Sequence, residues 1–418
     1  MGKTTLSIKV SKKNSVILAF FLTLFSVGCA KTKITEILPA TGGGGGGGGL
    51  VLTSGVNLKK LAVGELKGFA LTTSNVAQAW GDNYENNNGS FAQLGLGIVG
   101  AGTRTSPQTL DAATTYISLT SGETGSCGLT NTNKVKCWGV YNGDGTGTEA
   151  VSPVLINDGG SATYIDVDFG AYHGCAVQTS GVVTCWGDGY DGKLGNGDGS
   201  GGQQDSPVVA DAGTNYVRVS AGRNHTCGIT TAGLMRCWGD NGSGQIGDGT
   251  TATPRLAAIT VDGTNTYSFV SVGDDSNCAI TTAGVLKCWG DNGYGQLGDN
   301  SNVSKSSPTI IDTGTTYSKV SVGGVYYMHT CAVTTSGVLK CWGDNGSGQL
   351  GNGSTTSSSV PIIIDSGVSY KDVSVNFDHS CGVTTAGVLK CWGSNGSGQL
   401  GLGNTTSQNV PTAVGSGY

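Results

Sequence analysis

Twelve cysteines are the residues whose type and spacing most directly suggest chemistry. They form six pairs, ten positions apart in each case: Cys127 with Cys137, Cys175 with Cys185, Cys227 with Cys237, Cys278 with Cys288, Cys331 with Cys341, and Cys381 with Cys391. In a hairpin with a three-residue turn, residues i and i+10 lie opposite each other at a distance that a disulfide can span. Metal binding is the alternative, but zinc sites favour closer cysteine spacing and a second pair of ligands nearby. The spacing therefore predicts six cross-strand disulfides and export to an oxidising compartment.

The thirteenth cysteine, Cys29, follows a segment typical of an export signal. Residues 1–28 contain four lysines and no acid, and Val16–Val27 is apolar but short for a membrane span. A small residue, Gly28, directly before a cysteine and after such a run resembles a bacterial lipobox. We therefore predict a lipoprotein signal peptide over 1–28 and lipid attachment at Cys29. The alternative is an ordinary cleaved signal peptide that leaves Cys29 free.

A tether is predicted over residues 29–55, because Gly42–Gly49 are eight consecutive glycines and cannot hold one conformation. Ala30 after Cys29 favours the outer membrane over the inner one, by resemblance to bacterial lipoproteins. The predicted location is thus the cell envelope, as an outer-membrane lipoprotein facing the periplasm or the cell surface. The lipid on Cys29 would be the contact with the membrane.

Charge argues against a nucleic-acid partner. The formal net charge is −5. Removing residues 1–28 leaves 19 basic and 28 acidic residues, a net charge of −9. No basic cluster remains in that part, and phosphate contacts supply most nucleic-acid affinity.

No catalytic residue, cofactor or metal site is predicted. The four histidines, His173, His225, His329 and His379, each lie two residues before the first cysteine of a pair, so they occupy a repeat position and read as structural. Serine and threonine are plentiful, but none has a dedicated histidine partner. Asp-Asn-Gly loops, as at Asp240–Gly242, lack the late bidentate glutamate of calcium loops and are better explained as turns.

A repeat of about 50 residues must position all of these groups. All seven tryptophans precede a glycine, and seven of the eight prolines follow these Trp-Gly pairs in the same frame. One unit runs from Tyr317 to Ile364, with four predicted strands at Lys319–Gly323, Cys331–Thr334, Val338–Trp342 and Pro361–Ile364. In the first unit Phe69 and Ala79 replace the two cysteines. We predict an all-β chain, a seven-bladed β-propeller of four-stranded antiparallel blades over residues 56–418.

Two recurring segments carry a family resemblance. Cys341–Gly351 reads CWGDNGSGQLG and His329–Gly337 reads HTCAVTTSG. These resemble the repeat of the regulator of chromosome condensation family, over about residues 56–418. Gly-Gln-Leu-Gly recurs in several units, and the second unit has lost it. The founding member's guanine-nucleotide exchange and chromatin binding are not expected here, because this chain looks exported and acidic. A secreted bacterial β-lactamase inhibitor with a related propeller, whose loops grip another protein, is the better analogy.

Divergence between units suggests where a partner binds. The segment before each His-x-Cys differs most, and it is expected on the same face as the long Gly-rich loop. Aromatic and arginine side chains anchor many protein interfaces. The candidate partner-binding residues are Tyr84, Phe91, Tyr172, Tyr190, Arg223, Tyr294, Tyr326, Tyr327 and Phe377. The alternative is unconstrained drift at these positions.

The sequence thus favours a non-catalytic, membrane-anchored, exported scaffold that binds a protein or a glycan. One alternative is a secreted propeller enzyme acting on polysaccharide, which would need acids converging on one face or on the channel mouth. The spacing of acids along the sequence shows no such cluster. Guanine-nucleotide exchange, the second alternative, rests on family analogy alone and would require a cytosolic location.

Overall fold

A computed structural model describes residues 61–83, 93–98, 102–324 and 328–416. Its first four sheets contain four consecutive strands each. These are β1 (Leu61–Val63), β2 (Lys67–Leu71), β3 (Ala77–Gly81), β4 (Arg104–Leu110); β5 (Tyr116–Ser121), β6 (Gly125–Thr130), β7 (Val135–Gly139), β8 (Ala150–Leu155); β9 (Tyr164–Phe169), β10 (His173–Gln178), β11 (Val183–Gly187), β12 (Gln204–Ala210); β13 (Tyr216–Ala221), β14 (His225–Thr230), β15 (Met235–Gly239), β16 (Arg255–Val261).

The other three sheets repeat the pattern. Their strands are β17 (Tyr267–Val272), β18 (Ser276–Thr281), β19 (Leu286–Gly290), β20 (Lys305–Ile310); β21 (Tyr317–Val322), β22 (His329–Thr334), β23 (Leu339–Gly343), β24 (Ser358–Ile364); β25 (Tyr370–Asn376), β26 (His379–Thr384), β27 (Val388–Gly393), β28 (Gln408–Ser416). One short 3₁₀ turn, η1 (Tyr190–Gly192), follows β11. Within the described ranges no helix is long and apolar enough to cross a membrane.

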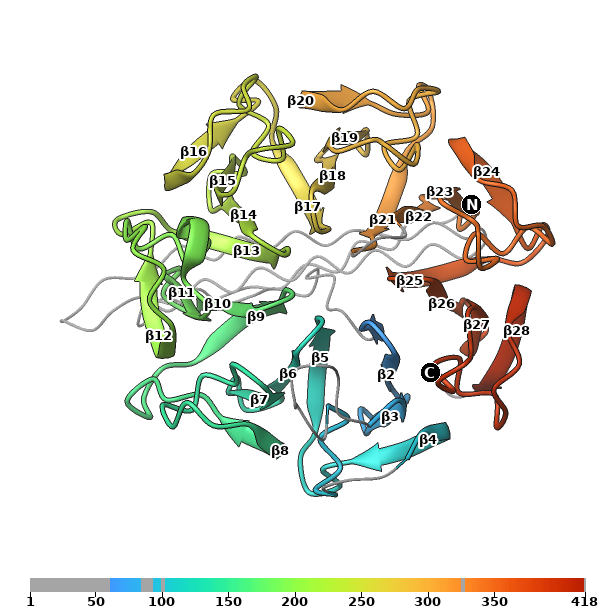
Figure 1. Cartoon of the computed structure of the whole chain (residues 1–418), viewed down its shortest axis with the longest axis horizontal. Helices are drawn as coiled ribbons and strands as arrows, with labels where there is room; N and C mark the ends of the chain where they lie inside the picture. The colour runs from blue at the N-terminus through green and yellow to red at the C-terminus, as the bar shows by residue number, and fades with distance from the viewer. Residues whose placement is uncertain (1–60, 84–92, 99–101, 325–327, 417–418) are drawn as a thin grey trace, which may run out of the picture. The chain divides into compact units, whose positions relative to one another are not determined.

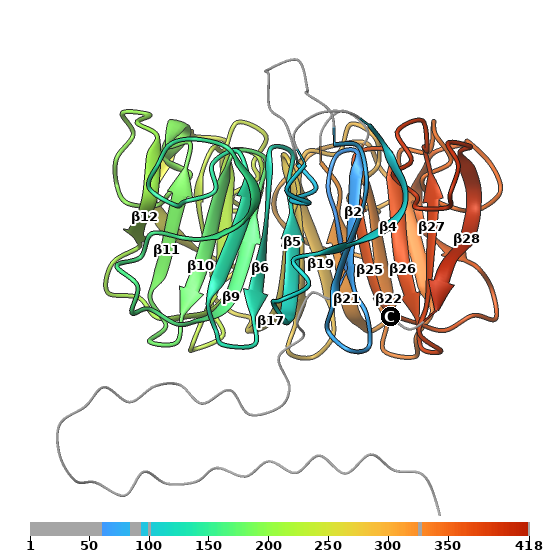
Figure 2. The same ribbon diagram turned by 90° about the horizontal axis from the view of Figure 1, so that it is seen from below.

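The seven sheets are the blades of a propeller. Figure 1 shows them arranged in a ring about a common centre, with the first strand of each blade innermost and the fourth at the rim. Figure 2 shows the strands running between the two faces of the ring, so loops gather at both faces. The predicted seven blades of four antiparallel strands are therefore confirmed. The domain limits at residues 28 and 55 lie outside the described residues.

The six predicted disulfides are all present, and each joins the second and third strands of a blade. The Cα–Cα distances are 4.0 to 4.1 Å. The three-residue turn of the hairpin sets this register, which is why the spacing of ten was sufficient to predict it. The bonded partners are Cys127 and Cys137 in blade 2, Cys175 and Cys185 in blade 3, Cys227 and Cys237 in blade 4, Cys278 and Cys288 in blade 5, Cys331 and Cys341 in blade 6, and Cys381 and Cys391 in blade 7.

Blade 1 fills the same position without a disulfide. Its register pairs Phe69 with Ala79. Phe69 packs edge-on against Trp138 of blade 2, with ring centroids 5.5 Å apart. A large and a small apolar side chain therefore replace the crosslink, as the sequence indicated.

Strand limits in the sample unit were predicted to within three residues, and the fourth strand differs most. Pro361 was expected to begin that strand, but β24 already begins at Ser358. A proline can lie inside β24 because this strand is at the outer edge, where a missing N–H group removes no ladder bond.

The ring closes without strand exchange, because β1–β4 and β25–β28 each form a complete blade. Side chains join the two: the Val63 amide donates to Ser374 Oγ (3.0 Å), and Asn376 Nδ2 donates to the Val63 carbonyl (3.2 Å). The Ser374 bond is one of a series. Val272, Val322 and Val375 likewise donate to a serine of the preceding blade. A serine at one strand position thus joins blade 4 to 5, blade 5 to 6, blade 6 to 7 and blade 7 to 1.

A second repeated contact between blades, which we call the latch, lies beside the segments that connect the last strand of one blade to the first strand of the next. Asp262 follows β16 of blade 4 and has a positive φ of 46°. It accepts hydrogen bonds from Tyr267 (2.6 Å) and Lys287 (2.5 Å), which both belong to blade 5. Burial raises the pKa of Asp262, but the bonds from Lys287 and Tyr267 outweigh it and leave this pKa below its ordinary value. The pKa values of Asp111 and Asp312 are lowered by equivalent bonds.

Replacing Asp262 with asparagine should therefore destabilise the protein in a pH-dependent way. A depressed carboxyl pKa contributes stability above the unfolded value, near pH 4, and loses it as pH falls through the folded value. We expect Asp262→Asn to cost about 1–3 kcal/mol at pH 7. The gap to wild type should narrow between about pH 5 and pH 2 in thermal unfolding. A gap that stays constant with pH would contradict the latch.

Candidate binding face at the channel mouth

The two kinds of loop expected to carry the binding site do emerge on one face. In blade after blade, the amide that follows Trp-Gly donates to a carbonyl in the loop between the first two strands. Examples are Asp240 to Asn224, Asp291 to Asp275 (both 2.8 Å) and Asp344 to Met328 (2.9 Å). We call this side of the ring the mouth face. It comprises the loops between the first and second strands and between the third and fourth strands of each blade.

The channel itself is narrow. Its walls come from the first strands of all seven blades and include Asp168, Phe269 and Lys319. The cavity volume is about 110 Å³, below the roughly 300–1,000 Å³ of typical small-molecule sites. Asp168 accepts bonds from Ser220 Oγ (2.7 Å) and the Ala221 amide (3.1 Å), so it joins blades. The channel mouth, where the loops begin, is therefore the better candidate for a site.

Acidic residues do converge at the mouth, contrary to the expectation from the sequence. Glu65, Glu123 and Asp274 line it, each from the first loop of a different blade, and Asp378 occupies the same loop of blade 7. Sequence spacing could not show this cluster, because each blade contributes one member and the members lie tens to hundreds of residues apart. The ring brings them together.

Two predicted site residues, Tyr172 and Arg223, form a continuous chain across four blades. The Tyr172 hydroxyl donates to Glu123 Oε1 (3.1 Å) and accepts from Arg223 Nη2 (3.2 Å). Arg223 Nη1 reaches Asp274 Oδ2 (3.4 Å), and its guanidinium lies 5.5 Å from the centre of the Tyr172 ring. Burial and then the charge of Glu123 raise the pKa of Tyr172 to about 12, so it remains neutral at physiological pH.

The remaining predicted residues are more scattered. Tyr190 and Tyr294 lie on the long loops of blades 3 and 5, where they are 63% and 47% exposed. Phe377 lies in the first loop of blade 7, half-buried, with a positive φ of 48°. Tyr84, Phe91, Tyr326 and Tyr327 lie outside the described residues. Among the described residues, the mouth face therefore has the two exposed tyrosines Tyr190 and Tyr294 and the bonded Tyr172–Arg223 pair.

The repeat histidine is replaced in blade 1 by Lys67. This lysine is 1% exposed, and Nζ donates to Gln93 Oε1 (2.5 Å) and to the Glu123 carbonyl (3.0 Å). Burial lowers the pKa of Lys67 to about 8, although the charges of Glu65, Glu123 and other acids oppose this shift. The sequence analysis did not identify Lys67 as a site residue. It could have been found from its position two residues before Phe69, which is the position of the histidine in other repeats.

The histidines bond neighbouring blades, in agreement with the predicted structural role. Nε2 of His173, His225 and His329 contacts Thr226, Asn277 and Ser380 of the following blade at 2.7 to 2.8 Å. Within the described ranges His379 lacks such a partner, because Gly68 occupies the corresponding position in blade 1. Three of the four histidines thus join one blade to the next, and among the described residues His379 does not.

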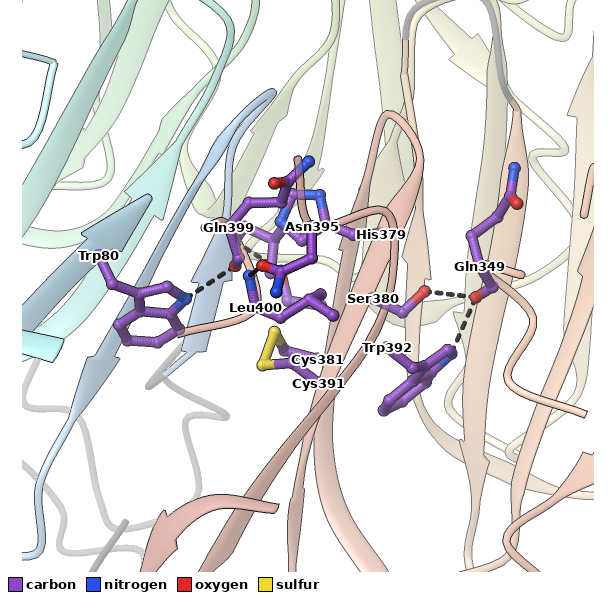
Figure 3. Close-up of a disulfide and its surroundings, with 12 residues drawn as sticks. Trp80, Gln349, His379, Ser380, Cys381, Cys391, Trp392, Asn395, Gln399 and Leu400 are labelled. Carbon is purple, nitrogen blue, oxygen red and sulfur yellow. Dashed lines mark hydrogen bonds between the residues drawn. A yellow bond between two sulfur atoms is a disulfide. The ribbon is translucent and has the colours of Figure 1, made fainter. Parts of the chain in front are cut away.

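Figure 3 shows one carbonyl that takes part in these contacts between blades. The Gln349 carbonyl accepts hydrogen bonds from both Ser380 Oγ and Trp392 Nε1 (2.8 Å each). The tryptophan frame follows the same scheme elsewhere. Trp80 donates to the Gln399 carbonyl (2.8 Å), on the far side of the Cys381–Cys391 disulfide from Trp392 in Figure 3.

Trp186 departs from this scheme. Its Nε1 is buried and has no hydrogen-bond partner among the described residues. The preceding blade 2 is the one that lost the Gly-Gln-Leu-Gly element, which supplies the accepting carbonyl elsewhere. The exception therefore has a direct cause in the sequence of the repeat.

Turn chemistry also accounts for the Asp-Asn-Gly loops. Asn292 Oδ1 accepts from the Leu297 amide (3.0 Å), and its Nδ2 donates to Asp299 Oδ1 (3.0 Å) and the Ser301 carbonyl (3.0 Å). Among the described residues, no group of three or more His, Cys, Asp or Glu side chains is arranged to hold a metal ion. The asparagine side chains of these turns therefore hold the long loops together by hydrogen bonds within each loop.

Comparison with known proteins identifies the family. The model of the RCC1-like domain matches residues 86–417. The chain belongs to this family. The predicted family resemblance is therefore confirmed, whereas its bacterial lipoprotein character remains a prediction.

Relatives of the RCC1-like domain differ widely in size. The human E3 ubiquitin-protein ligase HERC2 is 30% identical over 325 residues, which are 74% of this chain but 6% of the ligase. Among solved structures, human WBSCR16 has a TM-score of 0.69 at 19% identity, covering 81% of this chain and 93% of that one. Prp20p from Saccharomyces cerevisiae has a TM-score of 0.66 at 17% identity, covering 86% and 87%. The two structures support the fold alone.

Proposed function

We propose that this protein is a non-catalytic binding scaffold, exported and anchored in a membrane by a lipid on Cys29, whose mouth face docks a protein partner. The observation that carries the proposal is the mouth face itself. Exposed Tyr190 and Tyr294, the Tyr172–Arg223 pair and converging acids all lie on one side of a cross-linked ring. Such a rigid frame presents loops in a fixed arrangement, which reduces the entropy lost on binding.

Export is supported by the chemistry of the cysteines. Six disulfides are typical of proteins in oxidising compartments, and they leave Cys29 as the single cysteine outside the pairing. Prp20p has been described together with its binding to Gsp1p and histones, so a propeller of this fold can serve protein recognition. A glycan is the alternative ligand.

The docking face can be tested with paired variants. We expect Tyr190→Ala/Tyr294→Ala to lower the cross-linking of the protein to its envelope partners at least about fivefold, because exposed aromatic side chains anchor interfaces. The matched control is Leu155→Ala/Ile363→Ala, two aliphatic side chains 54% and 58% exposed on the outer strands β8 and β24. The control should retain wild-type cross-linking, and both double variants should melt like wild type. Equal cross-linking by all three proteins would contradict the proposal.

A second function, hydrolysis of polysaccharide, gains one observation from the converging acids. Burial, followed by the charge of Glu123, raises the pKa of Glu65, and an acid with a raised pKa beside a carboxylate suits glycoside hydrolysis. Release of reducing sugar from envelope polysaccharide by wild type, and its loss in Glu65→Gln, would establish this function in place of the scaffold.

A further inference from the structure

Acidic charge is concentrated on the mouth face. We count each charged residue of the described ranges with the loop that holds it or, within the first three residues of a strand, with the loop just before. The mouth face then has six basic residues: Lys67, Arg104, Lys193, Arg223, Arg255 and Lys305. Against them stand seventeen acids: Glu65, Asp82, Glu123, Asp144, Glu149, Asp188, Asp191, Asp198, Asp205, Asp240, Asp248, Asp274, Asp275, Asp291, Asp299, Asp344 and Asp378. The opposite face has eight acids and nine basic residues by the same count, and Asp168, farther along β9, belongs to neither face. Nearly all of the net negative charge of the described ranges therefore lies at the mouth.

Most of the basic residues on the mouth face are already engaged. Arg223 bonds Asp274, Arg255 pairs with Asp248 (2.6 Å) and Lys305 with Asp299 (3.4 Å). Lys193 pairs with Asp188, and the ammonium of Lys67 bonds an amide and a backbone carbonyl. The surplus acids therefore create a negative field over this face that would attract a cationic partner.

Three carboxylates belong to the first loops of three consecutive blades, 7, 1 and 2. Glu65 lies in the loop after β1, Glu123 in the loop after β5 and Asp378 in the loop after β25. Glu65 and Glu123 line the same cavity, and the Lys67 ammonium of blade 1 donates to the Glu123 carbonyl (3.0 Å). Blade 7, which holds Asp378, is bonded to blade 1 through Val63. In agreement with this geometry, the charges of Glu123, Lys67 and Asp378 all act on Glu65. The loops of blades 7, 1 and 2 thus place three acids along one part of the mouth.

Two oxygen atoms of this cluster are buried and without a hydrogen bond. Among the described residues, neither Glu123 Oε2 nor Asp378 Oδ1 receives a hydrogen bond. The Asp378 residue is only 8% exposed, so water has little access to it. Asp378 Oδ1 lies 3.8 Å from His379 Nδ1, which is charged only when protonated. A buried carboxylate oxygen without a donor is costly, so these atoms are suited to an incoming group with several N–H donors.

The geometry points to a cationic polypeptide segment as the partner class, with one lysine or arginine side chain bound among Glu65, Glu123 and Asp378. This inference rests on the proposed docking role of the mouth face. The cluster suits an organic cation better than a metal, because within the described residues its carboxylates are not arranged as a metal site. An ammonium offers three donors and a guanidinium five, enough to satisfy both open oxygens.

Neighbouring residues extend the site outward. On the side of blades 3 and 4, Arg223 is bonded to Tyr172 and already neutralises the charge of Asp274. A cationic side chain is therefore not expected to bind there. Tyr190 and Tyr294 stand farther out on the same face, where their rings can receive further lysine or arginine side chains of the segment. The segment would thus be held by one deep cationic contact and by aromatic contacts around it.

Titration with hexalysine, acetylated and amidated at its ends, tests the inference on the purified full-length protein. We expect wild type to bind it by calorimetry at low salt, whereas hexaglutamine should not bind. Glu65→Gln/Glu123→Gln should weaken hexalysine binding at least about tenfold. The matched control, Asp191→Asn/Asp198→Asn, removes two exposed charges from the same face and should weaken it less than about twofold. The single variant Glu65→Gln tests the same site if the double variant does not fold. Both double variants should melt like wild type.

The possible outcomes distinguish failure of the cationic site from failure of the docking face. No binding of hexalysine by wild type, or equal weakening by both double variants, would overturn the cationic site. If cross-linking still depends on Tyr190 and Tyr294, the docking face then stands with a partner of other chemistry. Loss of that dependence alone would overturn the proposed function.

Discussion

Reduction of the six disulfides should cause the largest loss of stability in this protein. The entropic model gives each ten-residue crosslink about 2–3 kcal/mol, and the total approaches the whole stability of a typical folded protein. We expect treatment with a phosphine reductant to lower the melting temperature by at least about 15 °C. Calorimetric scans with and without reductant measure this directly.

The variant Cys29→Ser is the control for that measurement. Cys29 takes no part in the six pairs, so the variant should melt like wild type and lose the same number of degrees on reduction. A reduced protein that melts within a few degrees of the oxidised one would show that packing alone holds the blades.

Alanine at Gly122 should have the second-largest effect, because a row of glycines lets the blades meet at the mouth. A Cβ atom on Gly122 would lie 1.6 Å from the Gly170 carbonyl oxygen, and one on Gly170 would lie 1.9 Å from that of Gly222. The next position around the ring, Gly222, is less tight, at 2.3 Å from the Gly273 oxygen. Because the obstructing atoms belong to the backbone, no flexible side chain can move aside, and the blades must separate.

We expect Gly122→Ala to cost more than about 3 kcal/mol, or to prevent folding. The cost should decrease in the order Gly122→Ala, Gly170→Ala, Gly222→Ala, and denaturant unfolding of the soluble variants measures it. Gly396→Ala is the control, since a Cβ there meets nothing within 4 Å. Equal stability of Gly122→Ala and Gly396→Ala would contradict the steric argument.

The fold was predictable because the repeat supplies the same evidence seven times. Trp-Gly pairs, in-frame prolines and cysteines ten apart each indicate the same blade, so one misread unit changes little. Details that depend on the ring were not predictable. The partner of His225 is Asn277, 52 positions later, and only side-by-side packing of blades makes them neighbours.

The candidate site shows the same limit more strongly. Tyr172 and Arg223 were found as divergent loop residues, but their hydrogen bond required the geometry of adjacent blades. Glu65 and Asp378 lie at opposite ends of the domain and occupy neighbouring blades only because blade 7 closes on blade 1. Comparison between repeats identifies positions that vary; the closed ring shows which of them face one another.

Intact-mass spectrometry of the mature protein from the membrane fraction tests the central claim, that this is an exported, lipid-anchored and cross-linked propeller. We expect a chain that begins at Cys29, bears a diacylglyceryl or triacylated modification on that residue, and is lighter by the twelve hydrogens of six disulfides. A soluble chain with an unmodified Cys29 and twelve free thiols would contradict it.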